Sequence, residues 1–160
     1  MNINEVIANR ANEILGFSKG EYYPIHPNDH VNMGQSTNDV IPTAASLTAY
    51  ELLNGCIEKL IKLSYEFNIK AEEFTDVIKM GRTEMQDAVP ISLGSEFKAF
   101  SMAIGRDVKR LESVKDSLLE VNLGGTAVGT GITANEKYID SVVLELSNIF
   151  DEHIIPVSYT

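Results

Sequence analysis

The chain has 160 residues, enough to bury the core of one domain, so we expect a single central helical domain over residues 1–160. Its 44% hydrophobic and 22% charged residues are typical of a globular protein, and no apolar run is long enough to span a membrane. The formal charge of −10 argues against nucleic-acid binding, because neutralising phosphates requires clustered Lys and Arg.

The cysteine content and the first residues indicate the compartment. Cys56 is the only cysteine, which excludes an internal disulfide framework and a multi-cysteine zinc site. The opening MNINEVIANRANEILG lacks the basic and then apolar order of a secretion signal. We therefore expect a cytoplasmic protein, and we expect neither a metal ion nor a cofactor.

Helical periodicity dominates the chain. Residues 4–16 have an apolar face and end at Gly16, and residues 39–74 and 92–121 predict two long helices with apolar steps of three and four. Residues 135–150 predict a last amphipathic helix. The expected fold class is all-α, a bundle of long helices. The apolar face of the first segment consists of Val6, Ile7, Ala11, Ile14 and Leu15.

The two long helices bear on the oligomeric state. A helix of thirty residues is about 45 Å long, which is too long for a compact monomer of this size to cover. Apolar burial should therefore continue across a subunit boundary, and we expect a homo-oligomer formed by helix packing.

The first polar interruption contains HPNDH, residues 26–30. Pro, Asn and Asp are common turn formers, so a plain turn is one interpretation. Metal binding by His26 and His30 would require a helix, which Pro27 and the Asn-Asp pair oppose. The alternative is an anion pocket in which Asp29 fixes the tautomer of a histidine.

Ser36-Thr37-Asn38-Asp39 precedes the first long helix. An N-cap at Asn38 or Asp39 explains part of this run, because a short side-chain acceptor pairs with free amides of the first turn. A carboxylate bound by Ser36 and Thr37 at the positive end of the helix dipole is the other interpretation.

Two further interruptions are polar or rich in glycine. One of them is GRTEMQD, residues 81–87. In one interpretation Arg82 forms a solvated ion pair with a nearby acidic residue, and in the other Thr83 and Glu84 contact a substrate ammonium or carboxylate. Residues 122–131, NLGGTAVGTG, match no phosphate-binding pattern. We interpret this stretch first as a tight passage between helices and second as a source of backbone donors.

Together these segments resemble a known family. NEVIANRA, HPNDHVNxxQSTND, GRTxxQDAxPxxLGxEF and GGTAVGTG occur in the order found in the aspartase/fumarase superfamily of helical-bundle lyases. Class II fumarases typically have QSSND and GRTHTQDATP, so QSTND and GRTEMQDAVP favour the ammonia-lyase side. The resemblance implies a homotetrameric carbon–nitrogen lyase that reversibly converts L-aspartate to fumarate and ammonia by anti elimination.

The resemblance also implies roles for residues. Ser36 and Thr37 would hold the substrate β-carboxylate, Asn38 the α-amino group, and Thr83 with Glu84 the α-carboxylate or amino end. The chemistry fits, because removing a proton beside a carboxylate builds an aci-carboxylate dianion that needs preorganised donors. Glu84 would repel a dicarboxylate unless it faces an ammonium, which favours aspartate over malate.

A second site follows from the same resemblance. His26, Asn28 and Asp29 match a second dicarboxylate site of fumarases, and active sites in the superfamily are assembled from three subunits. The superfamily's catalytic serine lies in a GSSxMPxKxNP loop that does not occur in this sequence. We therefore expect a central piece of a longer enzyme, with no catalytic residue of its own and no activity by itself.

Other functions stay open at this point. A class II fumarase acting on malate would have many of the same motifs. A non-catalytic helical assembly module would use its polar loops only for caps and turns. A lyase acting on argininosuccinate or adenylosuccinate is less well supported, because a nucleotide phosphate needs basic groups that this acidic chain does not offer.

Overall fold

The computed structural model describes residues 2–157. The chain divides into two compact units, Met1–Leu47 with Leu119–Thr160, and Thr48–Leu118. The expected single domain over residues 1–160 stays a prediction, and its residues 1 and 158–160 lie outside the described part.

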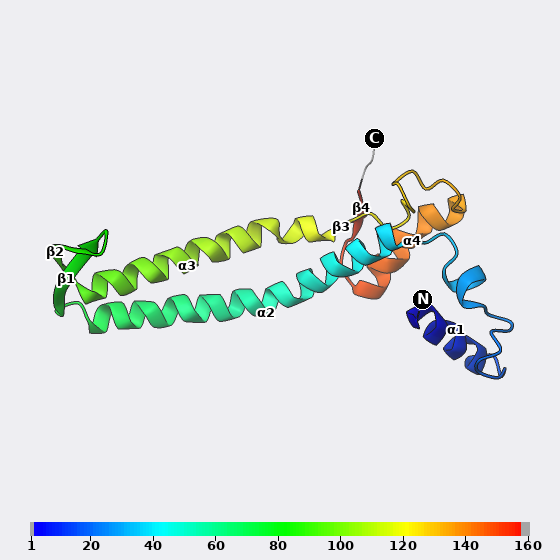
Figure 1. The fold of residues 1–160 in the computed structure, drawn as a ribbon, viewed down its shortest axis with the longest axis horizontal. Coiled ribbons are helices and arrows are strands. Elements are labelled where there is room, and N and C mark those ends of the chain that lie inside the picture. Colours follow the sequence, from blue (N-terminus) through cyan, green and yellow to red (C-terminus); the bar gives the residue numbers. More distant parts are fainter. Residues whose placement is uncertain (1, 158–160) are drawn as a thin grey trace. The chain divides into compact units, whose positions relative to one another are not determined.

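Helices dominate both units (Figure 1). They are α1 (Asn2–Ile14), α2 (Thr37–Glu73), α3 (Leu93–Lys115) and α4 (Glu136–Phe150), with a π-helical turn at Pro27–Val31 and a 3-10 turn at Asp116–Leu119. The strands are short: β1 (Ile78–Thr83), β2 (Gln86–Ser92), β3 (Glu120–Val121) and β4 (Ile155–Pro156). The expected all-α fold class is confirmed. We expected Pro27 and the Asn-Asp pair to oppose a helix at residues 26–30, and this was wrong, because a single π-helical turn begins at Pro27, a position where a helix tolerates proline.

The first unit has a small apolar core. Leu47 of α2, Val121 of β3, Val143 of α4 and Ile154 beside β4 are buried together. The pairing of β3 with β4 is parallel, and it continues where the Val157 amide donates to the Val121 carbonyl at 2.8 Å. This core joins the start of α2 to α4, although these segments are far apart in the sequence.

The second unit is a helical hairpin in which α2 and α3 lie side by side (Figure 1). Phe67 of α2 packs against Phe97 and Phe100 of α3, with ring centroids 5.9 and 5.7 Å apart. Farther along, the Ser64 hydroxyl donates to the Ser101 carbonyl at 3.0 Å, and the Ser101 hydroxyl donates to the Ser64 carbonyl at 2.9 Å. Reciprocal bonds of this kind fix the register of the two helices.

A β-hairpin that periodicity did not predict connects α2 to α3. β1 and β2 pair antiparallel from Ile78↔Ser92 to Thr83↔Gln86, with a bulge in β2, where residues 88 and 89 lie opposite Gly81. The turn residues Glu84 and Met85 have φ values of +49° and +60°, the geometry of a type I′ turn. Asn-Gly is the usual signal for this turn, and its absence is why the sequence suggested only a break.

The apolar face expected on α1 is not buried within the described chain. Val6 is 68% exposed and Ile14 is 70% exposed, whereas Ala8 and Asn12 are completely buried. Asn12 anchors the helix, because its side chain exchanges hydrogen bonds of 2.9 and 2.8 Å with the backbone of Ile25. A polar contact to a loop therefore decides which side of α1 faces inward.

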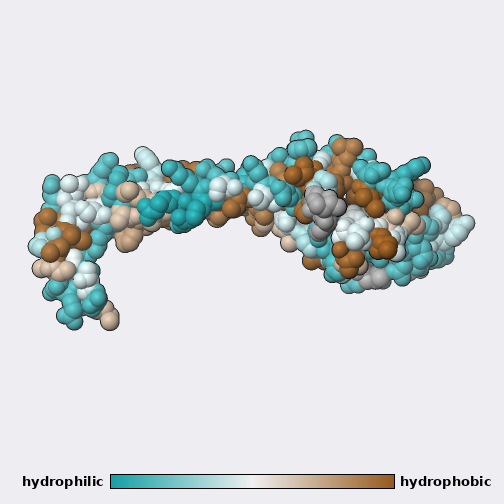
Figure 2. All heavy atoms as spheres, turned by 90° about the horizontal axis from the view of Figure 1, so that it is seen from above, coloured by the Kyte–Doolittle hydropathy of each residue, from teal (hydrophilic) through white to brown (hydrophobic). Residues whose placement is uncertain are grey.

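Apolar side chains also lie on the surface among hydrophilic ones (Figure 2). On the helical hairpin these include Leu52, Tyr65 and Met102, which are all more than half exposed. Among the described residues, no helix combines the length and the apolar character needed to cross a membrane.

Candidate functional site

α2 begins in a capping box. The Ser36 hydroxyl oxygen accepts the Asn38 amide at 3.1 Å, and the Asp39 carboxylate accepts the Ser36 amide at 2.9 Å. The prediction that Asn38 or Asp39 is the N-cap was wrong, because the helix starts at Thr37 and Ser36 supplies the cap. The Ser36 oxygen acts as an acceptor here, so its hydroxyl hydrogen can still be donated to an anion.

A cavity of about 380 Å³ lies beside this helix start. It brings together Ser36 and Thr37, two of the predicted substrate-binding residues. Amide side chains share the lining, and one pair of them is joined by a 3.0 Å bond from Asn4 to Asn32. The lining consists of Asn2, Ile3, Asn4, Asn32, Gln35, Ser36, Thr37, Val40 and Ile41.

Sequence reasoning did not assign the amides of this cavity to the site. Asn32 and Gln35 stand next to the QSTND motif in the chain, so their position was an available signal. Asn2 and Asn4 belong to α1, and only the tertiary structure brings them to the cavity. These amides add neutral hydrogen-bonding groups beside the hydroxyls.

Asn38 points to the glycine-rich segment after β3. Its Nδ2 donates to the Ala127 carbonyl at 2.9 Å, while Asn122 Nδ2 donates to the Asn38 carbonyl at 2.8 Å. That carbonyl would normally accept the amide of residue 42, which is proline and has no N–H. Asn122 therefore replaces the hydrogen bond that Pro42 cannot form.

Asp39 links the same segment to the helix. Its side chain is completely buried, and its second carboxylate oxygen accepts the Thr126 amide at 3.0 Å. Thr126 has a positive φ of 59°, a conformation held in place by this contact. The first interpretation of residues 122–131, a passage between helices, is therefore incomplete, because the segment is fastened to the start of α2.

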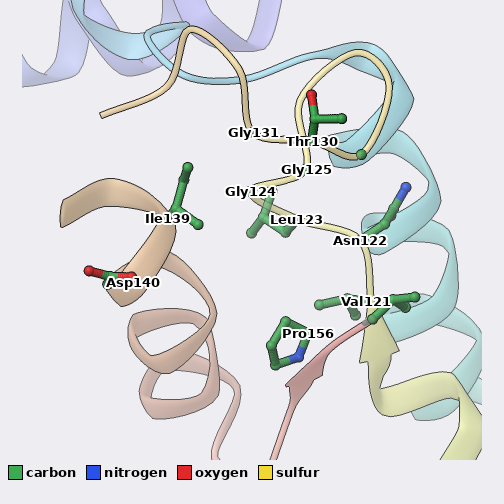
Figure 3. A pocket seen from close by; sticks show the side chains of 12 residues that line it. Val121, Asn122, Leu123, Gly124, Gly125, Thr130, Gly131, Ile139, Asp140 and Pro156 are labelled. Atoms are coloured by element: carbon green, nitrogen blue, oxygen red, sulfur yellow. The ribbon is translucent and has the colours of Figure 1, made fainter. Parts of the chain in front are cut away.

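A second cavity, of about 360 Å³, lies on the other side of the glycine-rich segment (Figure 3). Gly124, Gly131 and Thr130 line it opposite Ile139 and Asp140 of α4. Figure 3 shows Asn122 directed toward α2, in agreement with its bond to Asn38. Ile139 approaches Gly131 so closely that a Cβ at Gly131 would lie 2.7 Å from its Cδ1 atom.

Tyr138 is the titratable group near Asp39 whose pKa is shifted. Burial of the phenol, and secondarily the negative charge of Asp39, raise the pKa of Tyr138 above its usual value. Its hydroxyl and that of Thr126 are buried, and neither has a hydrogen-bond partner in the described part of the protein. The ring packs against the backbone at Gly34, where a Cβ would lie 3.1 Å from a ring carbon.

The predicted second site forms a local turn. His26 Nδ1 accepts the amides of Asn28 and Asp29, both at 3.3 Å, and lies 3.3 Å from an Asp29 carboxylate oxygen. A ring nitrogen that accepts is unprotonated, so the backbone amides place the proton on Nε2. An Asp29 carboxylate oxygen lies at the same distance from this nitrogen as the two amides, so the expectation that Asp29 fixes the histidine tautomer stays a prediction. His30 Nδ1 in turn accepts the His26 amide at 2.8 Å.

Thr83 and Glu84 lie at the end of the β-hairpin, in the unit Thr48–Leu118. Both are exposed, and neighbouring Met85 is 95% exposed. Arg82 forms an exposed ion pair with Asp87 at 3.1 Å, as the solvated-pair interpretation predicted. The structure thus gathers Ser36 and Thr37 at one cavity of the first unit and places Thr83 and Glu84 together in the second.

Among residues 2–157, no group of three His, Cys, Asp or Glu side chains is arranged to hold a metal ion. The candidate site beside the start of α2 consists of hydroxyls, amides and the helix start itself. Such groups can bind a carboxylate and stabilise negative charge on it.

Comparisons with known proteins find aspartate ammonia-lyases among the relatives of this chain. Aspartate ammonia-lyase of Bacillus subtilis (strain 168) is 52% identical over 149 residues, which are 93% of this chain and 31% of that protein. The aspartate ammonia-lyase of Escherichia coli (strain K12) is 45% identical over 98% of this chain and 33% of its own length. The chain thus spans about a third of the curated relatives it matches.

A solved structure has the same fold. The fumarate lyase:delta crystallin from Brucella melitensis bound to cobalt has a TM-score of 0.85 and 50% identity, covering 99% of this chain and 34% of that one. The family described as lyase matches residues 1–157. The chain therefore belongs to this lyase family, within the aspartase/fumarase superfamily that its motifs indicated.

Proposed function

We propose that this chain supplies substrate-binding groups to an aspartate ammonia-lyase, which interconverts L-aspartate with fumarate and ammonia. The observation that carries the proposal is the cavity in which Ser36 and Thr37 meet at the start of α2. The identity of 45–52% to aspartate ammonia-lyases supports the choice of reaction.

Ser36 and Thr37 bind the β-carboxylate of the substrate. The first turn of α2 adds the positive end of the helix dipole, and the hydroxyl of Ser36 can still donate. Proton removal from the adjacent carbon places a second negative charge on that carboxylate, so donors already in position favour the aci-carboxylate over the ground state. Each such donor contributes about 3 kcal/mol to lowering the barrier.

Asn38 serves the amino end of the substrate in this proposal, and Glu84 serves it from another subunit, since active sites of the superfamily are assembled from three subunits. Asn38 donates through Nδ2 to Ala127, which orients its Oδ1 acceptor and suits it to an ammonium group. Glu84 adds a carboxylate, and Thr83 beside it adds a hydroxyl for the α-carboxylate. A negative Glu84 favours an amino-bearing substrate over malate.

His26, Asn28 and Asp29 form a second carboxylate site in this proposal. His26 presents an Nε2 proton, because its Nδ1 accepts backbone amides. The backbone amides of Asn28 and Asp29 face this ring, so an anion would be bound by the His26 ring proton and the Asn28 side chain. Asp29 is exposed and opposes anion binding unless solvent screens it.

The enzyme is a cytoplasmic homotetramer in this proposal, and its subunits associate through helix packing. The exposed apolar residues of α1 and of the helical hairpin support subunit contact. The 160-residue chain by itself should be inactive, because proton abstraction needs a base and the superfamily's serine loop is not in this sequence.

The test uses the full-length protein. Fumarate formation, followed by ultraviolet absorbance, should appear with L-aspartate and not with L-malate. The variant Thr37→Val should lower kcat/KM about a hundredfold, as expected for the loss of one donor in an oxyanion-type site. Thr48→Val, an exposed position on the same helix, is the matched control and should leave turnover unchanged.

Fumarase is the second candidate function. The class II fumarase from Schistosoma mansoni has a TM-score of 0.76 and 37% identity, covering 94% of this chain and 32% of that one. Turnover of malate in preference to aspartate would establish this alternative. An unchanged kcat/KM in Thr37→Val would instead support the helical assembly module.

A further inference from the structure

We propose that Asp39 is a positioning residue: its buried carboxylate fastens the glycine-rich segment to the start of α2 and thereby sets the geometry of the substrate-binding groups at 36–38. This inference rests on the proposed function, because it concerns the binding of a dicarboxylate at that helix start.

The geometry of Asp39 is unusual for a residue that only caps a helix. One carboxylate oxygen accepts the Ser36 amide at 2.9 Å, as a capping residue does. The other oxygen accepts the Thr126 amide at 3.0 Å, from a residue 87 positions away in the sequence. The side chain has no solvent exposure, so both oxygens depend on these partners.

A carboxylate suits this position better than an amide. Each of the two oxygens faces a backbone N–H donor, and an ionised carboxylate accepts through both. Asparagine has the same shape but would present its own NH₂ group to one of these donors. The asparagine NH₂ group and the backbone N–H would then be two buried donors facing each other, so one hydrogen bond would be lost and both donors would stay unpaired.

The tether reaches the binding groups through Asn38. Asn38 donates to the carbonyl of Ala127, the residue that follows Thr126. When Asp39 holds the Thr126 amide, it also holds the carbonyl that orients the Asn38 side chain. The Ser36 amide on the other oxygen belongs to a residue that lines the cavity. Loss of the tether should therefore change ligand binding and not only stability.

The experiment compares Asp39→Asn with the unaltered full-length protein. Calorimetry measures the dissociation constant of succinate, and hydrogen exchange measures the protection of residues 36–38 and 124–131. We expect the succinate dissociation constant to rise about tenfold or more, and both segments to exchange faster. Asp76→Asn, an exposed acid in the turn after α2, is the matched control and should change neither quantity.

A second variant covers the case in which Asp39→Asn does not fold. Asp39→Glu retains the capping bond to Ser36, since glutamate is a natural residue at this place in a capping box. Its longer side chain displaces the oxygen that accepts from Thr126. We expect Asp39→Glu to fold, to loosen residues 124–131 and to bind succinate more weakly.

The outcomes separate the two proposals. Faster exchange with unchanged succinate binding would show a purely structural role and overturn this inference. Unchanged exchange and unchanged binding in both variants would overturn it as well. If the unaltered protein neither binds succinate nor converts aspartate, the proposed function itself fails, and this inference fails with it.

Discussion

Asn122 and Pro42 offer a direct test of how the glycine-rich segment is joined to α2. Asn122 donates to the Asn38 carbonyl at 2.8 Å and accepts from the Thr43 hydroxyl at 3.3 Å. Asn122→Ala removes both bonds. At about 0.5–1.5 kcal/mol for each neutral hydrogen bond, and with the first one exposed, we expect a loss of about 1–2 kcal/mol in the free energy of unfolding.

The second arm of the test restores the helix. In Pro42→Ala, the new amide of residue 42 can donate to the Asn38 carbonyl, as in an ordinary α-helix. Asn122→Ala in this background should then remove only the bond to Thr43, which costs about 0.5 kcal/mol. The coupling energy between positions 42 and 122 should therefore be about 1 kcal/mol.

Urea-induced unfolding of the four proteins measures this coupling, provided that the slope of the transition stays the same. Asn148→Ala, an exposed asparagine of α4, is the matched control and should stay within about 0.5 kcal/mol of the unaltered protein. If Asn122→Ala costs the same with proline or alanine at position 42, Asn122 does not replace the missing helix bond, and the reasoning is refuted.

Three further predictions concern single contacts. Tyr138→Phe should raise the free energy of unfolding by about 1 kcal/mol, because it removes a buried hydroxyl that has no partner in the described part of the protein. Since the fold raises the pKa of Tyr138, the unaltered protein should lose stability as pH rises above the usual value of 10.0, and the difference in stability between the variant and the unaltered protein should grow there. Unfolding measured as a function of pH checks this, and a constant difference would contradict the shift. Met85→Gly should stabilise the hairpin by about 0.5–1 kcal/mol in thermal unfolding, because φ is +60°, whereas Met85→Ala should bring no gain. Ser101→Ala should cost about 1–2 kcal/mol of the free energy of unfolding, measured with urea. Because the Ser64 and Ser101 hydroxyl oxygens lie 3.0 Å apart, Ser64→Ala should cost less in the Ser101→Ala background than in the unaltered protein, and strictly additive costs would argue against a shared network.

The candidate site was only partly accessible from the sequence. The motif QSTND drew attention to Ser36, Thr37 and Asn38, and the structure places the first two at one cavity. Asp39 was expected only as a possible cap. Its link to Thr126 could not be foreseen, because no local pattern indicates which distant amide a carboxylate will meet.

The sequence by itself determined where the helices form. Apolar spacing and the residues that start and stop a helix are local properties, and α2 and α4 lie close to the predicted ranges 39–74 and 135–150. The prediction for α3 was wrong at its end, because the helix stops at Lys115 and the chain continues to residue 121 as a 3-10 turn and β3. The motifs likewise identified the family, because they are strings of adjacent residues.

Only the tertiary structure decided which faces are buried and which polar groups meet. Periodicity marks Val6 and Ile14 as core residues of α1, yet both are exposed, and Asn12 is buried against Ile25. The bond from Thr126 to Asp39 joins residues 87 positions apart. Helix formation depends on neighbours within one or two turns, whereas burial and pairing of this kind depend on how distant segments come together during folding.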